Sequence, residues 1–227
     1  MKKVDILENI QIVHRGIYNN DKIIENTKEA FMIAIDKKFP IEFDVQMLKD
    51  DTLVIFHDSN INRLTNINKK VEELTSKDID IIKLKNTDSK IPLFGEILSI
   101  VKGRVLVDVE LKKCRHPLRF LRKVCDTLDS YKGNFIIKSF NPLYIGYIRL
   151  FRKDYIRGLL VNKKTARLPF SFFISKPDFV CADINIKNNK RLINYIDKYK
   201  CPLICYGVSD NDLDKKCYGY VVNKYIK

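Results

Sequence analysis

Carboxylate side chains recur at a spacing of two residues within two apolar runs of this sequence. Glu42 and Asp44 lie in IEFDV, and Glu110 precedes Lys112 in VLVDVELK. On a β-strand, residues two apart point to the same face, about 6–7 Å apart along the chain. Three hard oxygen donors without a neighbouring cysteine suit Mg²⁺ or Ca²⁺ better than Zn²⁺. The alternative is that these acids form a solvated strand face, which fits less well if helices cover the outside of the sheet.

Two of the three histidines follow apolar runs and have charged neighbours. His14 is followed by Arg15 in VHRG, and His57 by Asp58 in FHDS. A pair of imidazoles can divide proton transfers, because their ordinary pKa lies close to neutrality. Arg15 offers a bidentate donor for an anion, whereas Asp58 would either fix the tautomer of His57 or take part in a turn. We expect the third histidine, His116, to be an exposed or capping residue at the start of a helix.

These residue types together favour the cleavage of a phosphodiester. In such a reaction a divalent ion and cationic side chains neutralise the developing charge, while an acid and a base serve the leaving group and the nucleophile. The set comprises three carboxylates, two imidazoles and two cations: Glu42, Asp44, Glu110, His14, His57, Arg15 and Lys112.

The elements that must position these groups alternate between β-rich runs and amphipathic helical stretches. We expect strands at residues 11–13, 41–45, 52–56, 104–111, 134–139, 156–161, 178–184, 202–208 and 219–222. We expect the main helices at residues 26–38, 116–131, 141–153 and 189–200, the first and third of them capped by Asn26 and Asn141.

If the run 52–56 is a small excursion after the second strand, eight principal strands remain. That count predicts an α/β fold, a (β/α)8 TIM barrel, with a doubly wound open sheet as the alternative. Catalytic groups of such barrels lie at the carboxyl ends of the strands. The histidines, Glu110 and Lys112 come at or just after the ends of apolar runs, as a barrel requires.

The charge balance indicates an anionic partner. The chain of 227 residues has 42 Lys and Arg against 28 Asp and Glu, a formal net charge of +14. A phosphorylated small molecule, a phospholipid surface and a nucleic acid would all fit. The basic residues are spread along the chain and match no nucleic-acid-binding motif, so we do not expect a nucleic acid as partner.

The composition of the sequence and its lack of linkers and repeats favour one folded domain that comprises residues 1–227. The content of 45% hydrophobic residues excludes a disordered chain, and no linker or repeat divides the sequence. No run reaches the roughly 18–20 apolar residues of a membrane span, and Asp5 and Glu8 interrupt any signal-peptide core. We therefore expect a cytoplasmic protein. Its six cysteines include no Cys-x-x-Cys pair, and we expect them to be reduced, structural thiols.

The order of these motifs resembles that of the glycerophosphodiester phosphodiesterase family. The resemblance extends from about residue 11 to residue 142, and its most specific elements are HRG, E-x-D-V-Q, hD-x-x-x-x-R-x-T and E-x-K, beside QIVHRG, VEELTSKDI and IIKSFNP. It implies a (β/α)8 barrel that hydrolyses glycerophosphodiesters to glycerol 3-phosphate and an alcohol, either directly or through a cyclic phosphate.

The resemblance also implies roles for individual residues. His14 and His57 would be the general acid and base, while Arg15 and Lys112 would contact the substrate phosphate. The metal ligands would be Glu42, Asp44 and Glu110. Supporting positions would be Asn26, in the Glu-Asn element, together with Asp58 and Tyr206.

The C-terminal third departs from the family pattern. Tyr206 stands where the family usually has tryptophan, and Asn223 where it commonly has aspartate. Because the metal and histidine set is intact, these changes bear on the choice of substrate. Two other functions fit the sequence. One is a phospholipase of the lysophospholipase D or phosphoinositide-specific type acting at an anionic membrane, and the other is an inactive module that binds an anionic polymer.

Overall fold

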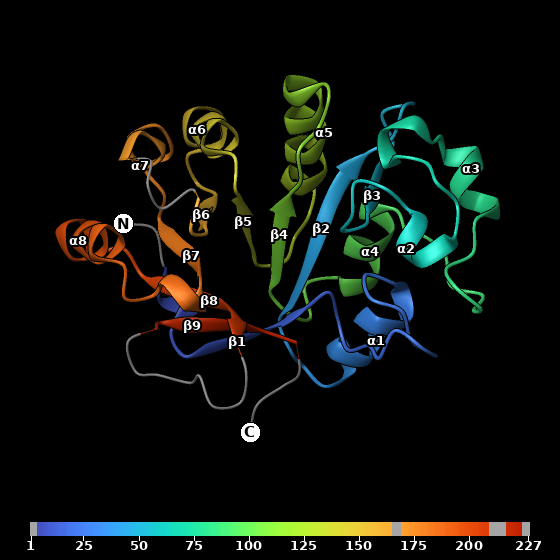
Figure 1. Cartoon of the computed structure of the whole chain (residues 1–227), viewed down its shortest axis with the longest axis horizontal. Helices are drawn as coiled ribbons and strands as arrows, with labels where there is room; N and C mark the ends of the chain where they lie inside the picture. Colours follow the sequence, from blue (N-terminus) through green and yellow to red (C-terminus); the bar gives the residue numbers. More distant parts are fainter. Residues whose placement is uncertain (1–3, 165–168, 209–216, 224–227) are drawn as a thin grey trace. The chain divides into compact units, whose positions relative to one another are not determined.

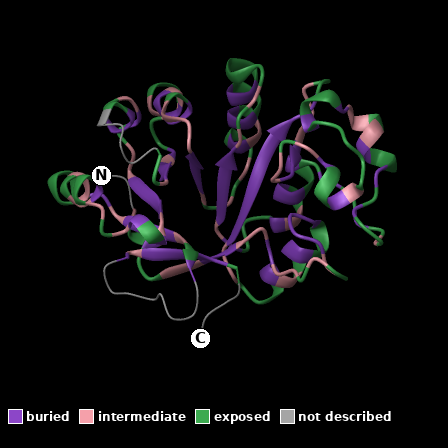
Figure 2. Ribbon diagram, in the orientation of Figure 1, coloured by how far each residue is buried: buried purple, intermediate pink, exposed green. Residues whose placement is uncertain are grey.

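The computed structural model describes residues 4–164, 169–208 and 217–223. The packing of the backbone divides the chain into two compact units, Met1–His14 with Phe135–Lys227, and Arg15–Asn134. Strands alternate with helices along the chain in both units (Figure 1). Most strand residues are buried, whereas the exposed residues lie mainly on helices and connections (Figure 2).

The unit Arg15–Asn134 contains three strands, five α-helices and a 3-10 helix among its described residues. They are α1 (Lys28–Asp36), β2 (Ile41–Met47), β3 (Leu53–Ile55), α2 (Asn62–Thr65), η2 (Val71–Glu73), α3 (Ser76–Ile81), α4 (Phe94–Val101), β4 (Val107–Leu111) and α5 (Pro117–Asp129).

Strand β2 is the centre of this unit. It pairs in parallel with β4 and antiparallel with the short β3. All seven of its residues are buried, and Phe43 packs edge-on against Phe31 of α1 and Phe94 of α4, with ring centroids 5.6 and 5.9 Å apart. The antiparallel β3, followed by α2, η2 and α3, is the expected excursion after the second strand.

The other unit contains six parallel strands among its described residues, in the order β1-β9-β8-β7-β6-β5. Its elements are η1 (Val4–Leu7), β1 (Ile10–His14), β5 (Phe135–Ser139), α6 (Pro142–Phe151), β6 (Ile156–Val161), α7 (Pro169–Ser175), β7 (Phe179–Asp183), η4 (Ile184–Ile186), α8 (Lys190–Tyr199), β8 (Leu203–Val208) and β9 (Gly219–Val222).

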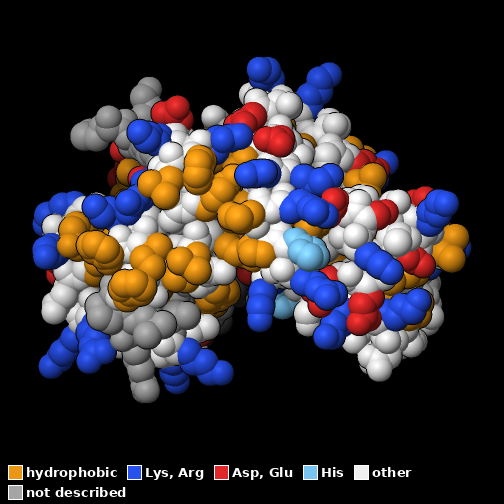
Figure 3. Space-filling model, turned by 90° about the horizontal axis from the view of Figure 1, so that it is seen from above, with side chains coloured by type: hydrophobic (Ala, Val, Ile, Leu, Met, Phe, Trp, Pro, Cys, Tyr) orange, Lys and Arg blue, Asp and Glu red, His pale blue; other side chains and the backbone are white. Residues whose placement is uncertain are grey.

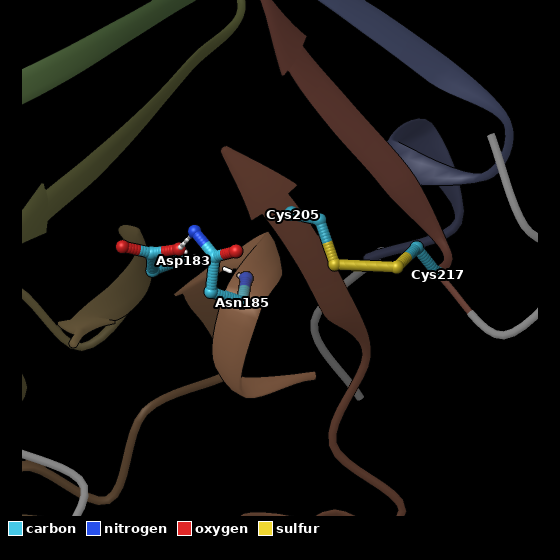
Figure 4. Close-up of a disulfide and its surroundings, with 4 residues drawn as sticks. All are labelled: Asp183, Asn185, Cys205 and Cys217. Atoms are coloured by element: carbon cyan, nitrogen blue, oxygen red, sulfur yellow. Dashed lines mark hydrogen bonds between the residues drawn. A yellow bond between two sulfur atoms is a disulfide. The ribbon is translucent and has the colours of Figure 1, made fainter. Parts of the chain in front are cut away.

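A disulfide links Cys205 of β8 to Cys217, two residues before the neighbouring strand β9 (Figure 4). The expectation that all six cysteines are reduced thiols is therefore wrong for these two. The sequence conceals the pair because strands β8 and β9 are adjacent only in the folded sheet. The other four, Cys114, Cys125, Cys181 and Cys201, form no disulfide.

The expected strands all occur, with bounds shifted by three residues at most, and the four expected helices occur as α1, α5, α6 and α8. Helices α2, α3, α4 and α7 are additional; each has eight residues or fewer, little more than two turns at most, which is too short to display the helical repeat clearly. His116 is exposed at the N-cap of α5, as expected. No helix within the described ranges has both the length and the apolar character needed to cross a membrane.

The two expected asparagine caps have different outcomes. Asn141 caps α6, its side chain accepting a hydrogen bond from the Leu143 amide, and Pro142 occupies the first turn. Helix α1 is instead capped by Thr27, whose hydroxyl accepts from the Ala30 amide. The assignment of Asn26 as a cap is wrong because its backbone takes a left-handed conformation, with φ of 56°, and its side chain turns to β2.

Candidate active site

Three buried carboxylates converge in the unit Arg15–Asn134. Glu42 and Asp44 point from the same face of β2, and the parallel register places Asp44 beside Glu110 of β4. One oxygen of each carboxylate lies within 4.8 Å of the others. All three residues are buried. The spacing of two residues therefore does bring these acids together, and the alternative of a solvated strand face is wrong. We call Glu42, Asp44 and Glu110 the acidic trio.

Two cations neutralise part of the acidic trio. Lys112, directly after β4, places its Nζ 2.8 Å from Glu110 Oε1 and 3.2 Å from Asp44 Oδ1. Arg15 Nε lies 3.4 Å from Asp44 Oδ2. Burial alone would raise the pKa of Asp44, but the positive charges of Lys112, His57 and Arg15 hold that pKa well below its usual range. Burial lowers the pKa of Lys112, and the attraction of Asp44 and Glu110 outweighs it, so that this pKa is raised.

The backbone around Arg15 is bent sharply to reach the acidic trio. Arg15 and Gly16 both have positive φ, 57° and 81°. A Cβ on Gly16 would lie 2.8 Å from the Ala30 carbonyl carbon, which explains glycine at this position. The Arg15 amide donates to the Glu42 carbonyl oxygen at 3.0 Å, and the Asn26 amide donates to the Arg15 carbonyl oxygen at 3.0 Å. A positive φ at a non-glycine residue costs conformational energy, and residues with such strained backbones cluster at functional sites.

Glu25 joins two arginines from distant parts of this unit. Its Oε1 accepts from Arg15 Nη1 and from Arg63 Nη2, both at 2.7 Å, and its Oε2 accepts from Asn20 Nδ2 at 2.8 Å. Burial alone would raise the pKa of Glu25, but the hydrogen bonds from Arg63 and Asn20 and the charge of Arg15 lower it to about 2. Glu25 is therefore an anion that holds two cations in place.

The arginine of α2 extends this network to His57. Arg63 Nε donates to Asp58 Oδ2 at 2.5 Å, and the other oxygen of Asp58 lies 2.6 Å from His57 Nδ1. Gln46 of β2 steadies the same loop, because its Nε2 donates to the carbonyl oxygens of Phe56 at 2.6 Å and of Asp58 at 2.8 Å. Asp58 is thus a partner of His57, one of the two roles that the sequence left open.

Glu25, Gln46 and Arg63 are absent from the set of site residues derived from the sequence. Gln46 and Arg63 are the final glutamine of E-x-D-V-Q and the arginine of hD-x-x-x-x-R-x-T, so the motifs contained the signal. Their partners could not be assigned from spacing, since Arg63 and Glu25 are 38 residues apart.

His14 and Tyr206 belong to the other unit and have partners there. His14 ends β1, and its Nδ1 lies 2.7 Å from Oδ1 of Asn223, which follows the neighbouring strand β9. Tyr206 of β8 donates its hydroxyl to the Val161 carbonyl oxygen at 3.2 Å, and its ring meets Phe140 edge-on, with centroids 6.2 Å apart.

The donor set of the acidic trio fits a divalent metal ion. Oxygen donors from carboxylates are the ligands that Mg²⁺ and Ca²⁺ prefer. Asn26 Nδ2 donates to Asp44 Oδ2 at 2.9 Å, while its buried Oδ1 has no hydrogen-bond partner within the described ranges. The linked cluster contains five carboxylates and only three lysine or arginine side chains, so a bound metal cation would offset its excess of negative charge. The members of the cluster are Glu25, Glu42, Asp44, Asp58 and Glu110 with Arg15, Arg63 and Lys112.

Comparisons with known proteins identify the fold and the family. A protein from Silicibacter pomeroyi, described as a glycerophosphoryl diester phosphodiesterase, has a crystal structure that matches with a TM-score of 0.81 at 18% identity, over 97% of this chain and 93% of that one. An Oleispira antarctica phosphodiesterase, solved in complex with the product sn-glycerol-3-phosphate, matches with a TM-score of 0.80 at 15% identity, over 96% and 94%. The shared fold is the (β/α)8 TIM barrel, so that prediction is confirmed.

Enzymes with a (β/α)8 barrel have their active sites at the carboxyl ends of the strands. The model of the glycerophosphoryl diester phosphodiesterase family matches residues 14–224, and the chain belongs to that family. A glycerophosphodiester phosphodiesterase of Bacillus altitudinis is 31% identical over 158 residues, which are 62% of this chain. The match spans 60% of the length of that relative.

Proposed function

We propose that this protein hydrolyses glycerophosphodiesters to glycerol 3-phosphate and an alcohol. The observation that carries the proposal is the buried acidic trio, linked through Arg15, Glu25, Arg63 and Asp58 to His57. Membership of the family and the product complex of the Oleispira phosphodiesterase support it.

Glu42, Asp44 and Glu110 would hold the metal ion, for which we propose Mg²⁺ or Ca²⁺. A divalent ion at this position supplies Lewis acidity and neutralises negative charge on a bound phosphate. Arg15 and Lys112 would contact the same phosphate; their ion pairs with the acidic trio keep both cations at the site. Asn26 supports Asp44 through its amide group.

The partners of the two imidazoles suggest how the proton transfers are divided. His57, oriented by its contact with the Asp58 carboxylate, would protonate the leaving alcohol. His14 faces the neutral amide of Asn223; with Nδ1–H donated to Oδ1, the neutral ring carries its lone pair on Nε2 and would act as the base. In the direct route a bond from phosphorus to water forms as the phosphorus–oxygen bond to the alcohol breaks. In the route through a cyclic phosphate the glycerol 2-hydroxyl forms that bond first, and water then attacks phosphorus while the bond to O2 breaks to give glycerol 3-phosphate. Tyr206 would provide an aromatic wall with a polar tip.

The test is hydrolysis of glycerophosphocholine in the presence of Mg²⁺ or Ca²⁺, followed through the release of glycerol 3-phosphate. His57→Ala and His14→Ala should each lower kcat by about 10²-fold or more. His116→Ala is the matched control, since this exposed histidine at the start of α5 should leave the rate unchanged. No turnover of any glycerophosphodiester by folded, metal-loaded protein would refute the proposal.

A phospholipase acting on lysophospholipids or phosphoinositides is the second candidate. It is favoured by an aromatic and basic surface on α7 and α8, which is described below. Turnover of lysophospholipid in vesicles without turnover of glycerophosphocholine would select this candidate. The intact acidic trio makes an inactive binding module the weakest of the three functions.

We also propose that residues 1–227 form one domain, supported by a family match that runs from residue 14 to residue 224. A cytoplasmic location stays a prediction. The Cys205–Cys217 disulfide weighs against it, because the cytosol keeps most protein thiols reduced.

A further inference from the structure

Exposed aromatic side chains are concentrated on three consecutive helices. Of the large hydrophobic side chains exposed in the described ranges, the aromatic ones are Phe151 of α6, Phe170 and Phe173 of α7, and Tyr199 of α8. Phe170 and Phe173 are 68% and 70% exposed and lie three residues apart, hence on one face of α7. Single exposed hydrophobic residues are ordinary, whereas a gathering of them marks an interaction surface.

A groove of about 770 Å³ lies between α7 and α8. Its walls are largely aromatic: Phe172 stacks on Tyr195 with centroids 4.0 Å apart, and Tyr195 lies 4.6 Å from Tyr199. Lys176, Arg191 and Lys198 complete the lining, together with Phe173, Pro177 and Asn194 and without any acidic residue. Figure 3 shows hydrophobic side chains gathered on the side of the molecule where α6 to α8 lie, with Lys and Arg around them.

The positive charge extends along the whole of α8. Between residues 187 and 200 there are five basic residues and one acidic residue, Asp197.

Helix α7 is held in place by α6, because Arg149 of α6 donates to the Ile174 carbonyl oxygen at 3.1 Å. Gly146 of α6 also allows close packing, since a Cβ there would lie 2.9 Å from Ile174 Cγ2. Helix α7 is therefore held firmly against α6.

We propose that the surface formed by Phe170, Phe173, Lys176, Arg191, Lys198 and Tyr199 docks onto an anionic phospholipid bilayer. Aromatic side chains insert at the boundary between headgroups and acyl chains, and each basic residue near an anionic leaflet adds to the attraction. Charge complementarity selects the anionic bilayer over a neutral one. Exposed phenylalanines beside the aliphatic Leu143 and Leu150 of α6 fit hydrocarbon better than the stacked bases of a nucleic acid.

The absence of tryptophan from the sequence makes a direct test possible. In Phe173→Trp the new indole is the single tryptophan of the full chain, and its emission should shift to shorter wavelength on mixed phosphatidylcholine–phosphatidylglycerol vesicles. Vesicles of phosphatidylcholine alone should give a much smaller shift, and added salt should reverse the response. Ile81→Trp is the matched control, because Ile81 is 80% exposed on α3 of the other unit and should give no shift.

Co-sedimentation of the unlabelled chain with the same vesicles gives the second measurement. The double variants Phe170→Ser/Phe173→Ser and Arg191→Glu/Lys198→Glu should each weaken binding to mixed vesicles by about tenfold or more. Ile81→Ser and Lys123→Glu, which change exposed residues outside this surface, should bind like the unmodified chain.

Three results would overturn the proposal. They are an absence of binding to mixed vesicles at low salt, equal binding by the variants and the unmodified chain, and a tryptophan shift caused by single-stranded DNA or by self-association but not by vesicles. None of these measurements requires turnover, so the docking surface stands or falls separately from the proposed hydrolysis. The variants on α7 and α8 should hydrolyse soluble glycerophosphocholine at the unmodified rate.

Discussion

His14 Nδ1 lies 2.7 Å from Oδ1 of Asn223, across the ends of the neighbouring strands β1 and β9. The contact follows from the parallel register: Val13 pairs with Val222, and His14 and Asn223 are the residues that come next in the chain. An amide oxygen at this position selects the tautomer and the orientation of the imidazole. Asn223 is therefore a positioning residue for His14, 209 residues away in the sequence.

We expect Asn223→Ala to lower kcat for glycerophosphocholine by about tenfold, the equivalent of one hydrogen bond, with little change in KM. Asn223→Asp keeps an acceptor oxygen for Nδ1–H and should restore most of the rate. Steady-state kinetics of the two variants, beside the exposed control Asn188→Ala, measure the effect. Equal losses in the alanine and aspartate variants would contradict a positioning role.

Metal binding should depend on each member of the acidic trio. Glu110→Gln removes one charged ligand and should weaken Mg²⁺ or Ca²⁺ binding by about tenfold or more, measured by titration calorimetry. Glu96→Gln, at an exposed position on α4, is the control and should bind metal like the unmodified chain. Chelation of divalent ions should abolish hydrolysis, and retention of full activity in the chelator would remove the metal from the mechanism.

The network around Glu25 should make stability depend on acid pH. The pKa of Glu25 is about 2 in the folded protein and ordinarily 4.5, so the folded state favours the ionised carboxylate. Its contribution is complete above about pH 4.5 and is lost as the pH falls towards about 2. Urea unfolding should therefore give a free energy of unfolding that declines across this window.

Glu25→Gln should remove the share of this decline in the free energy of unfolding that comes from Glu25. At pH 7 it should lower the free energy of unfolding by about 2 kcal/mol, less than for a fully buried pair, because the Arg63 side chain is 44% exposed. Glu96→Gln again serves as the control. An unchanged acid slope in Glu25→Gln would show that other carboxylates cause the decline.

The disulfide should protect two cysteines from alkylation and should stabilise the folded chain. Alkylation of the unfolded chain should label four cysteines without reductant and six after reduction. The double variant Cys205→Ala/Cys217→Ala should lose about 3 kcal/mol, as expected for a cross-link that closes a short loop. Cys114→Ala is the control, since this half-buried thiol takes part in no disulfide. Labelling of all six cysteines before reduction would refute the disulfide.

The sequence predicts the parts of the site that depend on local periodicity. The two-residue spacing places Glu42 and Asp44 on one face of β2, because strands expose alternate residues to opposite sides, and the register with β4 adds Glu110. Apolar runs ending in polar residues likewise locate β1, which ends at His14, and β3, which ends two residues before His57.

Features that depend on pairing between distant segments escape the sequence. The contact of Glu25 with Arg63 depends on how α2 packs, and the Cys205–Cys217 pair depends on the adjacency of β8 and β9. The position of Asn26 fits a helix cap in the sequence because asparagine favours both caps and left-handed turns, and only the backbone conformation distinguishes them. Nothing in the spacing of these residues reveals such contacts.

Strand β2 combines two tasks, because Gln46 shares a face with Glu42 and Asp44 and clamps the carbonyl groups on either side of His57. A deletion or insertion of one residue within β2 would reverse every side chain beyond it. Depending on where it fell, such a change would turn part of the acidic trio away from Glu110, release the histidine loop, or do both. Strand β2 therefore tolerates substitutions far better than a change in its length. Alignments of homologues should contain no gaps within it.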